Sequence, residues 1–401
     1  MTARHHYLVG TGTWFLGYGI QSVMFAWLVT MVLHETPERV GLAQMTLLLP
    51  GTLFILIGGS YADRFGGRLI AAMAQAAAGL AIVFLLVILL TDQLSYRMMI
   101  IYALIMGFAQ AFLTPARDGL LSQVAGGRVQ RMVMLTSIMQ FGLQMVGFFI
   151  ASTADELGPT VILSVQLLAL LIGVWAFLQI RDLEAPAIEQ PKLWHSLLEG
   201  AKTVFTSASM RMVMVQNTAM AMFFMGSYIV TLPLMVRESF SGSAADLAYM
   251  NAANSLGLVL TILLLLRLGD VRRQGRALLL AQGVGSVVFA SAAMAQSFAV
   301  FVFAVFVWGI CGGLAMTMSR TIMQEQAPAS QRGRVMSFFA FSFMGAGPIG
   351  ALLCGYLVEL FGPRIALLTA AGAMFGVIVV IGLASRIWRL EGHVHETLEA
   401  A

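Results

Sequence analysis

Charged side chains are scarce in this sequence: Asp, Glu, Lys and Arg make up 10% of its 401 residues, against 59% apolar residues. A soluble domain usually carries about a quarter charged residues. A water-soluble body of this size could not bury so much apolar surface, so the composition indicates a chain whose solvent is lipid. The two cysteines, Cys311 and Cys354, both fall within apolar runs, which favours packing roles over a disulfide or a metal pair.

The usual motifs of enzymes and pumps are also missing. The sequence has no zinc-type His-Glu spacing, no Gly-Lys phosphate loop and no serine in a nucleophile elbow. We therefore expect neither an enzyme nor an ATP-driven pump, with no catalytic residue, no metal and no cofactor. The arginines are scattered between apolar runs instead of forming a basic stripe, so the net charge of +4 does not indicate a nucleic-acid partner.

What the sequence does contain is a series of long apolar runs. A helix needs about 20 residues, at 1.5 Å each, to cross roughly 30 Å of hydrocarbon. The runs are too long for barrel strands and lack strict alternation. The sequence therefore predicts an all-α membrane protein with twelve transmembrane helices, near residues 7–33, 41–62, 69–90, 98–116, 132–154, 159–180, 212–236, 247–268, 277–296, 298–319, 336–358 and 365–387.

The basic residues sort strongly by side when these spans are threaded through a membrane. Only Arg39, Arg97, Arg237 and Arg364 fall on one side, and the remaining 19 of the 23 Lys and Arg residues fall on the other. Cytoplasmic loops carry the excess of positive charge. We therefore expect both termini in the cytoplasm, and a miscounted span would scramble this asymmetry.

A polar stretch divides the chain into two halves. The boundaries predict a six-helix bundle over 1–180, a cytoplasmic linker over 181–211 and a second six-helix bundle with a short tail over 212–401. Within the linker, "KLWHSLLEGAKTVF" has the pattern of an amphipathic helix, which could lie at the inner membrane surface or pack against the protein. At an offset of 203, five identities relate the halves: Arg117 with Arg320, Gln123 with Gln326, Arg131 with Arg334, Gly142 with Gly345, and Gly147 with Gly350. Parallel six-helix repeats occur in transporters that bind substrate near mid-membrane.

The stretch "GGSYADRFGGR" between the second and third spans resembles the corresponding loop of the major facilitator superfamily. The matching residues are Gly59, Asp63, Arg64, Gly66 and Arg68. The resemblance covers nearly the whole chain and implies that superfamily's fold of two six-helix bundles. The stretches "ETPERVGLAQMTLLLP", "LTPARDGLL", "LWHSLLEGAKTVF" and "QEQAPASQRGRVMS" are most similar to the branch that exports drugs, macrolides and siderophores.

Family membership implies that Asp63 acts as a conformational latch with Arg117, Arg128 or Arg131 at the inner ends of the helices. From the residues alone, a plain positive-inside anchor is equally allowed. The sequence also departs from the superfamily: the fourth span has no arginine, and the fifth lacks the proline of the antiporters' glycine-proline motif. The eleventh span has helix-packing or bending candidates in "GAGPIGALLCG": Gly345, Gly347, Pro348 and Gly350.

No carboxylate falls at the middle of a predicted span, which favours a neutral, amphipathic or aromatic substrate over a small ion. Polar residues within spans are candidates for lining the cavity, or for interhelical hydrogen bonds. These are Gln21, Gln110, Gln140, Gln144, Gln216, Asn217, Tyr228, Asn251 and Asn254. Asp118 and Glu325 are candidates for proton coupling or for ion pairs beside Arg117 and Arg320.

These patterns predict a secondary transporter that exports amphipathic small molecules by alternating access with proton coupling. A metabolite uptake permease or uniporter is the nearest alternative, and a membrane-embedded enzyme or sensor is a remote one. We expect a monomer surrounded by lipid in a bacterial-type cytoplasmic (inner) membrane.

Overall fold

The structure is a computed structural model that describes residues 2–125, 129–180, 193–268, 271–328, 331–385 and 387–390. Some helical residues are described by their backbone alone, and their side chains lie outside the description: Leu56, Asp63, Ser122, 129–131, 133–134, 193–197 and 332–333. Helices account for nearly all of the described chain, and its described parts contain no strand. The prediction of an all-α membrane protein is confirmed.

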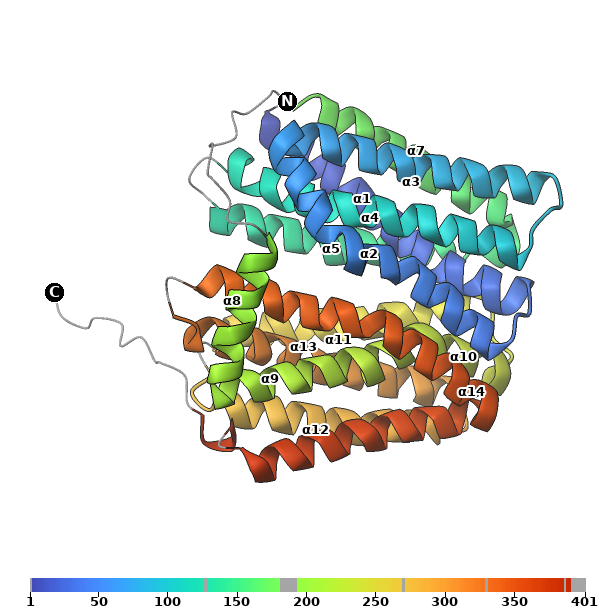
Figure 1. Cartoon of the computed structure of the whole chain (residues 1–401). Coiled ribbons are helices and arrows are strands. Elements are labelled where there is room, and N and C mark those ends of the chain that lie inside the picture. The colour runs from blue at the N-terminus through green and yellow to red at the C-terminus, as the bar shows by residue number, and fades with distance from the viewer. Residues whose placement is uncertain are drawn as a thin grey trace. The chain divides into compact units, whose positions relative to one another are not determined.

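The first compact unit comprises Met1–Glu189, Ile229–Ala252 and Ala351–Leu360. Within it, α1 packs against α5 and α7, α2 against α4, and α3 against α4 and α7. Helices α3 and α7 run side by side in Figure 1. The bounds of the helices that lie wholly in this unit are α1 Ala3–Trp27, η1 Leu28–Val32, α2 Pro37–Phe65, α3 Gly67–Leu90, α4 Tyr96–Val124, α5 Val129–Ala151, α6 Ala154–Leu157, α7 Pro159–Leu178 and α10 Leu232–Phe240. The unit also holds the end of η3 Ser227–Thr231, from residue 229 on.

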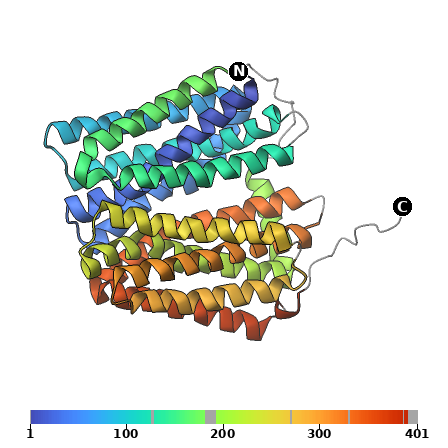
Figure 2. The same ribbon diagram turned by 180° about the vertical axis from the view of Figure 1, so that it is seen from behind.

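The second compact unit comprises Gln190–Tyr228, Ala253–Gly350 and Phe361–Ala401. Helix α12 packs against α13 and η4, and α9 packs against α8 and α13; Figure 2 shows α12 and α13 side by side. Its helices are α8 Leu193–Thr206, α9 Ala208–Ala219, η2 Met220–Met225, most of α11 Ala244–Leu268, α12 Gln274–Ala293, α13 Phe298–Gln326, most of α14 Arg332–Ala384 and η4 Ile387–Arg389. Because the units follow contacts and not sequence order, the division at 181–211 stays a prediction.

Local chemistry explains where several helices begin and turn. Pro37 and Pro159 stand at the start of α2 and α7, where a backbone N–H is not needed. The Ser207 and Ser297 side chains each accept a hydrogen bond from the backbone N–H three residues later, and so begin α9 and α13. Within α14, Gly362 has φ 78° and ψ 164°, so two helical rods meet at this residue.

Helices that could span a membrane occur throughout the described chain. Nine helical stretches among the described residues are long and apolar enough to cross a membrane, and Leu135–Ala151 is a shorter apolar helix. One of the nine is the 51-residue stretch Arg334–Ala384, which contains the turn at Gly362. The total of twelve spans stays a prediction.

The first helical run of each sequence half contains π-helical turns. In the first half, η1 continues α1, and in the second half η2 and η3 lie between α9 and α10. A π turn carries an extra residue per turn and is common at functional sites. The π turns of the second half directly follow Gln216 and Asn217, two residues predicted to line a cavity.

Candidate substrate pocket

A pocket of about 350 Å³ lies within the second unit. Its lining comes from α9, η2, α13 and α14: Asn217, Met220, Met316, Arg320, Met336, Phe339, Ala340, Phe343 and Met344. Four methionines and two phenylalanines make most of this surface apolar. Methionine is flexible and polarizable, so such a lining adapts to ligands of different shape.

Asn217 contributes an amide to the pocket and helps to hold its walls together. Its side chain is 3% exposed and donates hydrogen bonds to the Phe339 carbonyl oxygen at 3.3 Å and to Ser342 Oγ at 3.0 Å. These bonds tie α9 to α14. Neighbouring Gln216 is also buried, and its Oε1 accepts from Ser319 Oγ of α13 at 3.3 Å. The two adjacent amides therefore connect three helices around the pocket.

Arg320 introduces a fixed positive charge into this lining. The sequence placed it just past the end of a span at 319, but α13 continues to Gln326, so Arg320 belongs to the helix that forms the pocket wall. This pocket therefore carries a fixed charge, whereas a largely uncharged cavity at the middle of the membrane stays a prediction. No hydrogen bond or ion pair joins Arg320 to any part of the chain that the structure describes.

The other predicted cavity residues are distributed over both units and do not line this pocket. In the second unit, the Tyr228 ring lies 6.0 Å from that of Trp308, and the Asn254 carbonyl closely approaches Gly309. In the first unit, Asn251 Nδ2 donates to the Leu247 carbonyl at 2.7 Å. Also in the first unit, Gln21 is buried, and Gln110, Gln140 and Gln144 are half-buried. A cavity role for these residues stays a prediction.

Gln75, Gln166 and Gln282 are among the buried glutamines that the sequence analysis missed. Gln75 Nε2 in α3 donates to Thr13 Oγ1 at 3.2 Å, and Gln166 Nε2 in α7 donates to the Gly17 carbonyl at 3.0 Å. In the second unit, Gln282 Nε2 in α12 lies 3.4 Å from Met220 Sδ, beside the pocket. Gln75 and Gln282 occupy the third span of their respective halves, but the offset of 203 does not match them, so the repeat gave no signal for them.

The loop between α2 and α3 turns at Gly66, whose φ of 87° is in a region that glycine adopts readily. A Cβ on Gly67 would lie 2.9 Å from the Ala116 carbonyl of α4, while one on Gly59 would only touch Pro115. Arg68 Nη1 donates to the Ile180 carbonyl at 2.8 Å, and Arg64 lies over the Phe65 ring. The side chains of Asp63 and Arg131, and the whole of Arg128, lie outside the described residues, so the latch stays a prediction.

The two proton-coupling candidates contact neighbouring side chains. Asp118 accepts from Arg117 at 3.1 Å, and the Arg117 guanidinium also lies 4.8 Å from the centre of the Phe15 ring. Glu325 accepts from Gln274 Nε2 of α12 at 3.0 Å. Asp118 thus has the ion-pair role that the sequence offered as its alternative, whereas Glu325 accepts a hydrogen bond from a neutral amide.

The glycines of the eleventh span lie at a close helix crossing. A Cβ on Gly350 would overlap the Met222 carbonyl of η2, and Pro348 and Gly347 are buried next to it, with Gly345 half-buried one turn earlier. The first unit has the matching arrangement, because a Cβ on Gly147 in α5 would overlap the Leu16 carbonyl of α1. The repeat-related glycines thus serve the same crossing in each half.

A cluster that the sequence did not reveal joins four segments of the first unit. Arg237 of α10 donates from Nη1 to the carbonyl oxygens of Thr30 at 3.0 Å and Glu35 at 2.8 Å. Asp155 of α6 accepts from Trp27 Nε1 at 3.1 Å and from the backbone N–H of Ala244, at the start of α11, at 2.7 Å. We call these six residues the α1–α11 clamp. It links residues of the second sequence half to the end of the first helical run.

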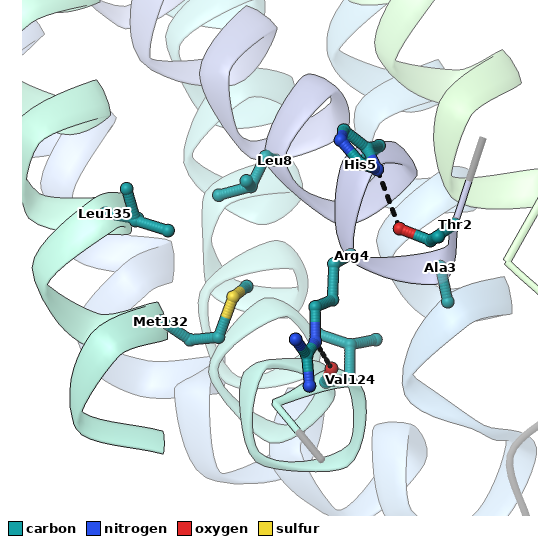
Figure 3. A pocket seen from close by; sticks show the side chains of 8 residues that line it. All are labelled: Thr2, Ala3, Arg4, His5, Leu8, Val124, Met132 and Leu135. Carbon is teal, nitrogen blue, oxygen red and sulfur yellow. Dashed lines mark hydrogen bonds between the residues drawn. The ribbon is translucent and has the colours of Figure 1, made fainter. Parts of the chain in front are cut away.

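A second pocket, of about 530 Å³, lies in the first unit at the start of α1 (Figure 3). Arg4 reaches across it and donates from Nε to the Val124 carbonyl at 3.1 Å and from Nη2 to the Ala125 carbonyl at 2.7 Å. Its guanidinium therefore satisfies the last carbonyl groups of α4. Because Arg4 is occupied in this way, we assign the residue a role in holding α1 against α4.

The family model for transmembrane secretion effectors (MFS_3) matches residues 9–398. The chain belongs to this family of major facilitator transporters. A curated relative, the MFS-type transporter YfiS of Bacillus subtilis strain 168, is 23% identical over 378 residues, which cover 88% of this chain and 87% of YfiS. Membership makes the protein a multi-pass membrane transporter of small molecules and not an enzyme.

Solved transporters share the fold of this secretion-effector family member. The nucleoside transporter NupG superposes with a TM-score of 0.77 at 12% identity, covering 96% of this chain and 99% of NupG. The peptide transporter family member PepTSo gives 0.79 at 11% identity, covering 96% and 98%. A bacterial homologue of the lysosomal transporter Spinster gives 0.72 at 12% identity, covering 96% of each chain. At these identities the likeness concerns the fold alone.

Proposed function

We propose that this transporter exports amphipathic small molecules, of drug, macrolide or siderophore type, by alternating access. The observation that carries the proposal is the pocket of the second unit, where four methionines and two phenylalanines surround the Asn217 amide. An adaptable apolar wall with few polar groups suits amphipathic ligands of varied shape. The description of the family as secretion effectors supports export over uptake.

We place the protein in a bacterial cytoplasmic membrane as a monomer surrounded by lipid, with both termini inside. Support comes from the bacterial relative and from the bias of Lys and Arg residues toward one side. In this orientation the α1–α11 clamp faces outward, because Arg237 and the segment around Asp155 belong to the side with few basic residues.

In an alternating-access cycle the clamp would be the outer gate. Its hydrogen bonds connect α1, α6, α10 and α11 at their predicted outer ends, and they must break whenever the substrate site opens outward. At the inner ends, the loop of Gly59, Asp63, Arg64, Gly66 and Arg68, with Arg117 and Arg131, is the proposed counterpart. A ligand shifts such an equilibrium only through its different affinities for the two states.

We propose coupling to protons, for which Asp118 and Glu325 remain the candidates. A structural neighbour described as a proton-dependent oligopeptide transporter supports this driving force. Proton flux into substrate-loaded proteoliposomes tests the proposal. We expect flux that depends on substrate, and transport that stays independent of pH and membrane potential would overturn proton coupling.

The export proposal is tested by growing a deletion strain, with and without the restored gene, on a panel of antibiotics, dyes and siderophores. We expect the deletion strain to retain more of at least one amphipathic compound and to grow less in its presence. Lower accumulation of a nutrient in the deletion strain would instead support the alternative, an uptake permease or uniporter. The nucleoside and peptide transporters that share the fold keep that alternative open.

A further inference from the structure

We propose that the pocket of the second unit binds small amphipathic organic anions, with the Arg320 guanidinium holding the anionic group and the methionines and phenylalanines holding the apolar part. This inference rests on the proposed transport function and names its substrate class. A carboxylate, sulfonate or phosphate group would meet Arg320, and a ring or short chain would fill the remaining volume.

The first argument is the state of Arg320 itself. Its guanidinium lines a mainly apolar pocket, and no described residue gives it a hydrogen bond or an ion pair. Arg320 is also an exposed residue, so a ligand that enters the pocket can reach its guanidinium. An anionic ligand supplies a bonding partner, and the planar fork of arginine matches the oxygens of carboxylates and related anions in two parallel hydrogen bonds.

The second argument is the contrast with the repeat-related arginine. In the first unit Arg117 pairs with Asp118 at 3.1 Å and stacks over Phe15 at 4.8 Å. In the second unit the residue after Arg320 is Thr321, whose hydroxyl donates to the Thr317 carbonyl of its own helix. The repeat therefore keeps the arginine but has Thr321 in place of the acid beside it, which leaves the second guanidinium available to a ligand.

The third argument concerns the size and chemistry of the rest of the pocket. A volume of about 350 Å³ is near the lower end of the roughly 300–1,000 Å³ that ligand pockets occupy. The amide of Asn217 is already used by Phe339 and Ser342, so Arg320 is the main polar group left to orient a ligand. The fitting ligand is thus small, with one anionic group and one apolar ring or chain.

Binding of two isosteric probes to the purified full chain in lipid nanodiscs tests this inference. Naphthalene-2-sulfonate carries the anion, and naphthalene-2-sulfonamide is its neutral match. We expect the wild type to bind the sulfonate about tenfold or more tightly than the sulfonamide, because a charge-assisted hydrogen bond contributes more than a neutral one. In Arg320→Gln the preference should vanish, with sulfonamide affinity unchanged.

Two further variants separate recognition from folding and from overall charge. Arg320→Lys keeps the cation and should retain most of the preference. Arg267→Gln removes the same charge from the exposed last turn of α11 and should leave both affinities unchanged. A wild type that does not bind the sulfonate or does not prefer it, or an Arg320→Gln variant that keeps the preference, overturns the inference. The growth experiment with the deletion strain tests the export proposal separately, so that proposal would stand if the strain panel showed export of neutral compounds.

Discussion

The repeat places Arg117 in the first unit and Arg320 in the second, and their surroundings differ. Arg117 has an acid beside it and an aromatic ring beneath it, so its charge is used within the fold. Arg320 lines a pocket and has no bonding partner among the described residues. The same residue of the repeat thus has different surroundings: Arg117 is ion-paired in one unit, and Arg320 lines a pocket in the other.

The comparison assumes that both units share the same helix crossing, and valine at Gly350 or Gly147 tests that assumption. Each new side chain would overlap a backbone carbonyl of the crossing helix, Met222 or Leu16. Overpacking typically costs about 1–3 kcal/mol. We expect both variants to melt at clearly lower temperatures in nanodiscs, by similar amounts. Gly142→Ala, at a position with open space, is the control and should melt like the wild type.

Thr321→Asp converts the second unit to the arrangement of the first. The new carboxylate would stand next to Arg320 as Asp118 stands next to Arg117, and it would compete with any anionic ligand. We expect about tenfold weaker binding of naphthalene-2-sulfonate and unchanged binding of the sulfonamide. Thr321→Asn, similar in size and uncharged, should bind the sulfonate like the wild type. Unchanged sulfonate affinity in the Thr321→Asp variant would contradict the claim that Arg320 binds anions because no acid stands beside it.

Arg237 extends the comparison to an arginine whose bonds all go to groups of the protein. Arg237→Gln removes two hydrogen bonds to carbonyl oxygens of the α1–α11 clamp, each worth about 1 kcal/mol or more, and also the ion pair with Glu238 at 2.6 Å. We expect a cysteine at Ser243, beside the clamp, to react several-fold faster with a polar maleimide. Arg39→Gln breaks an exposed ion pair with Glu35 and a contact with the Tyr96 ring, but no hydrogen bond of the clamp, and should change that rate little. Equal rates in both variants would argue against a clamp that opens.

Asp118→Asn should have the smallest effect. The Asp118 side chain is 63% exposed, so solvent screens its pairing with Arg117, and Phe15 still supports the guanidinium. We expect a loss of stability below about 1 kcal/mol, seen as a small shift of the melting temperature. The same variant also tests proton coupling, since substrate-dependent proton flux should disappear if Asp118 carries the proton.

The helices could be predicted because their cause is local. Long apolar runs bounded by proline, serine and glycine set the ends of elements such as α7, and Gly66 and the Gly147–Gly350 pair could be recognised from spacing. The exact end of a helix determined whether Arg320 could be recognised as a pocket residue. The apolar run stops at Ser319, so the sequence placed Arg320 in a loop, but α13 continues to Gln326.

Contacts between distant segments could not be predicted from one sequence. Asp155 and Ala244 lie 89 positions apart, and no local pattern connects them. Gln75 and Gln282 stand alone in alanine- and leucine-rich runs, where a single amide carries little signal. Of the predicted cavity residues, Asn217 reaches the pocket, because its helix leads into η2, whose first residue, Met220, also lines the pocket.

Locking the α1–α11 clamp tests alternating access most directly. In a chain with Cys311 and Cys354 replaced by alanine, Asp155→Cys and Ala244→Cys would place two thiols where the carboxylate now meets the backbone at 2.7 Å. Release of naphthalene-2-sulfonate from loaded proteoliposomes is then measured before and after reduction. When the two cysteines are oxidised to a disulfide, we predict that the probe is released no faster than from liposomes without the protein. Reduction of the disulfide should restore the release rate. Equally fast release in both states would contradict the account.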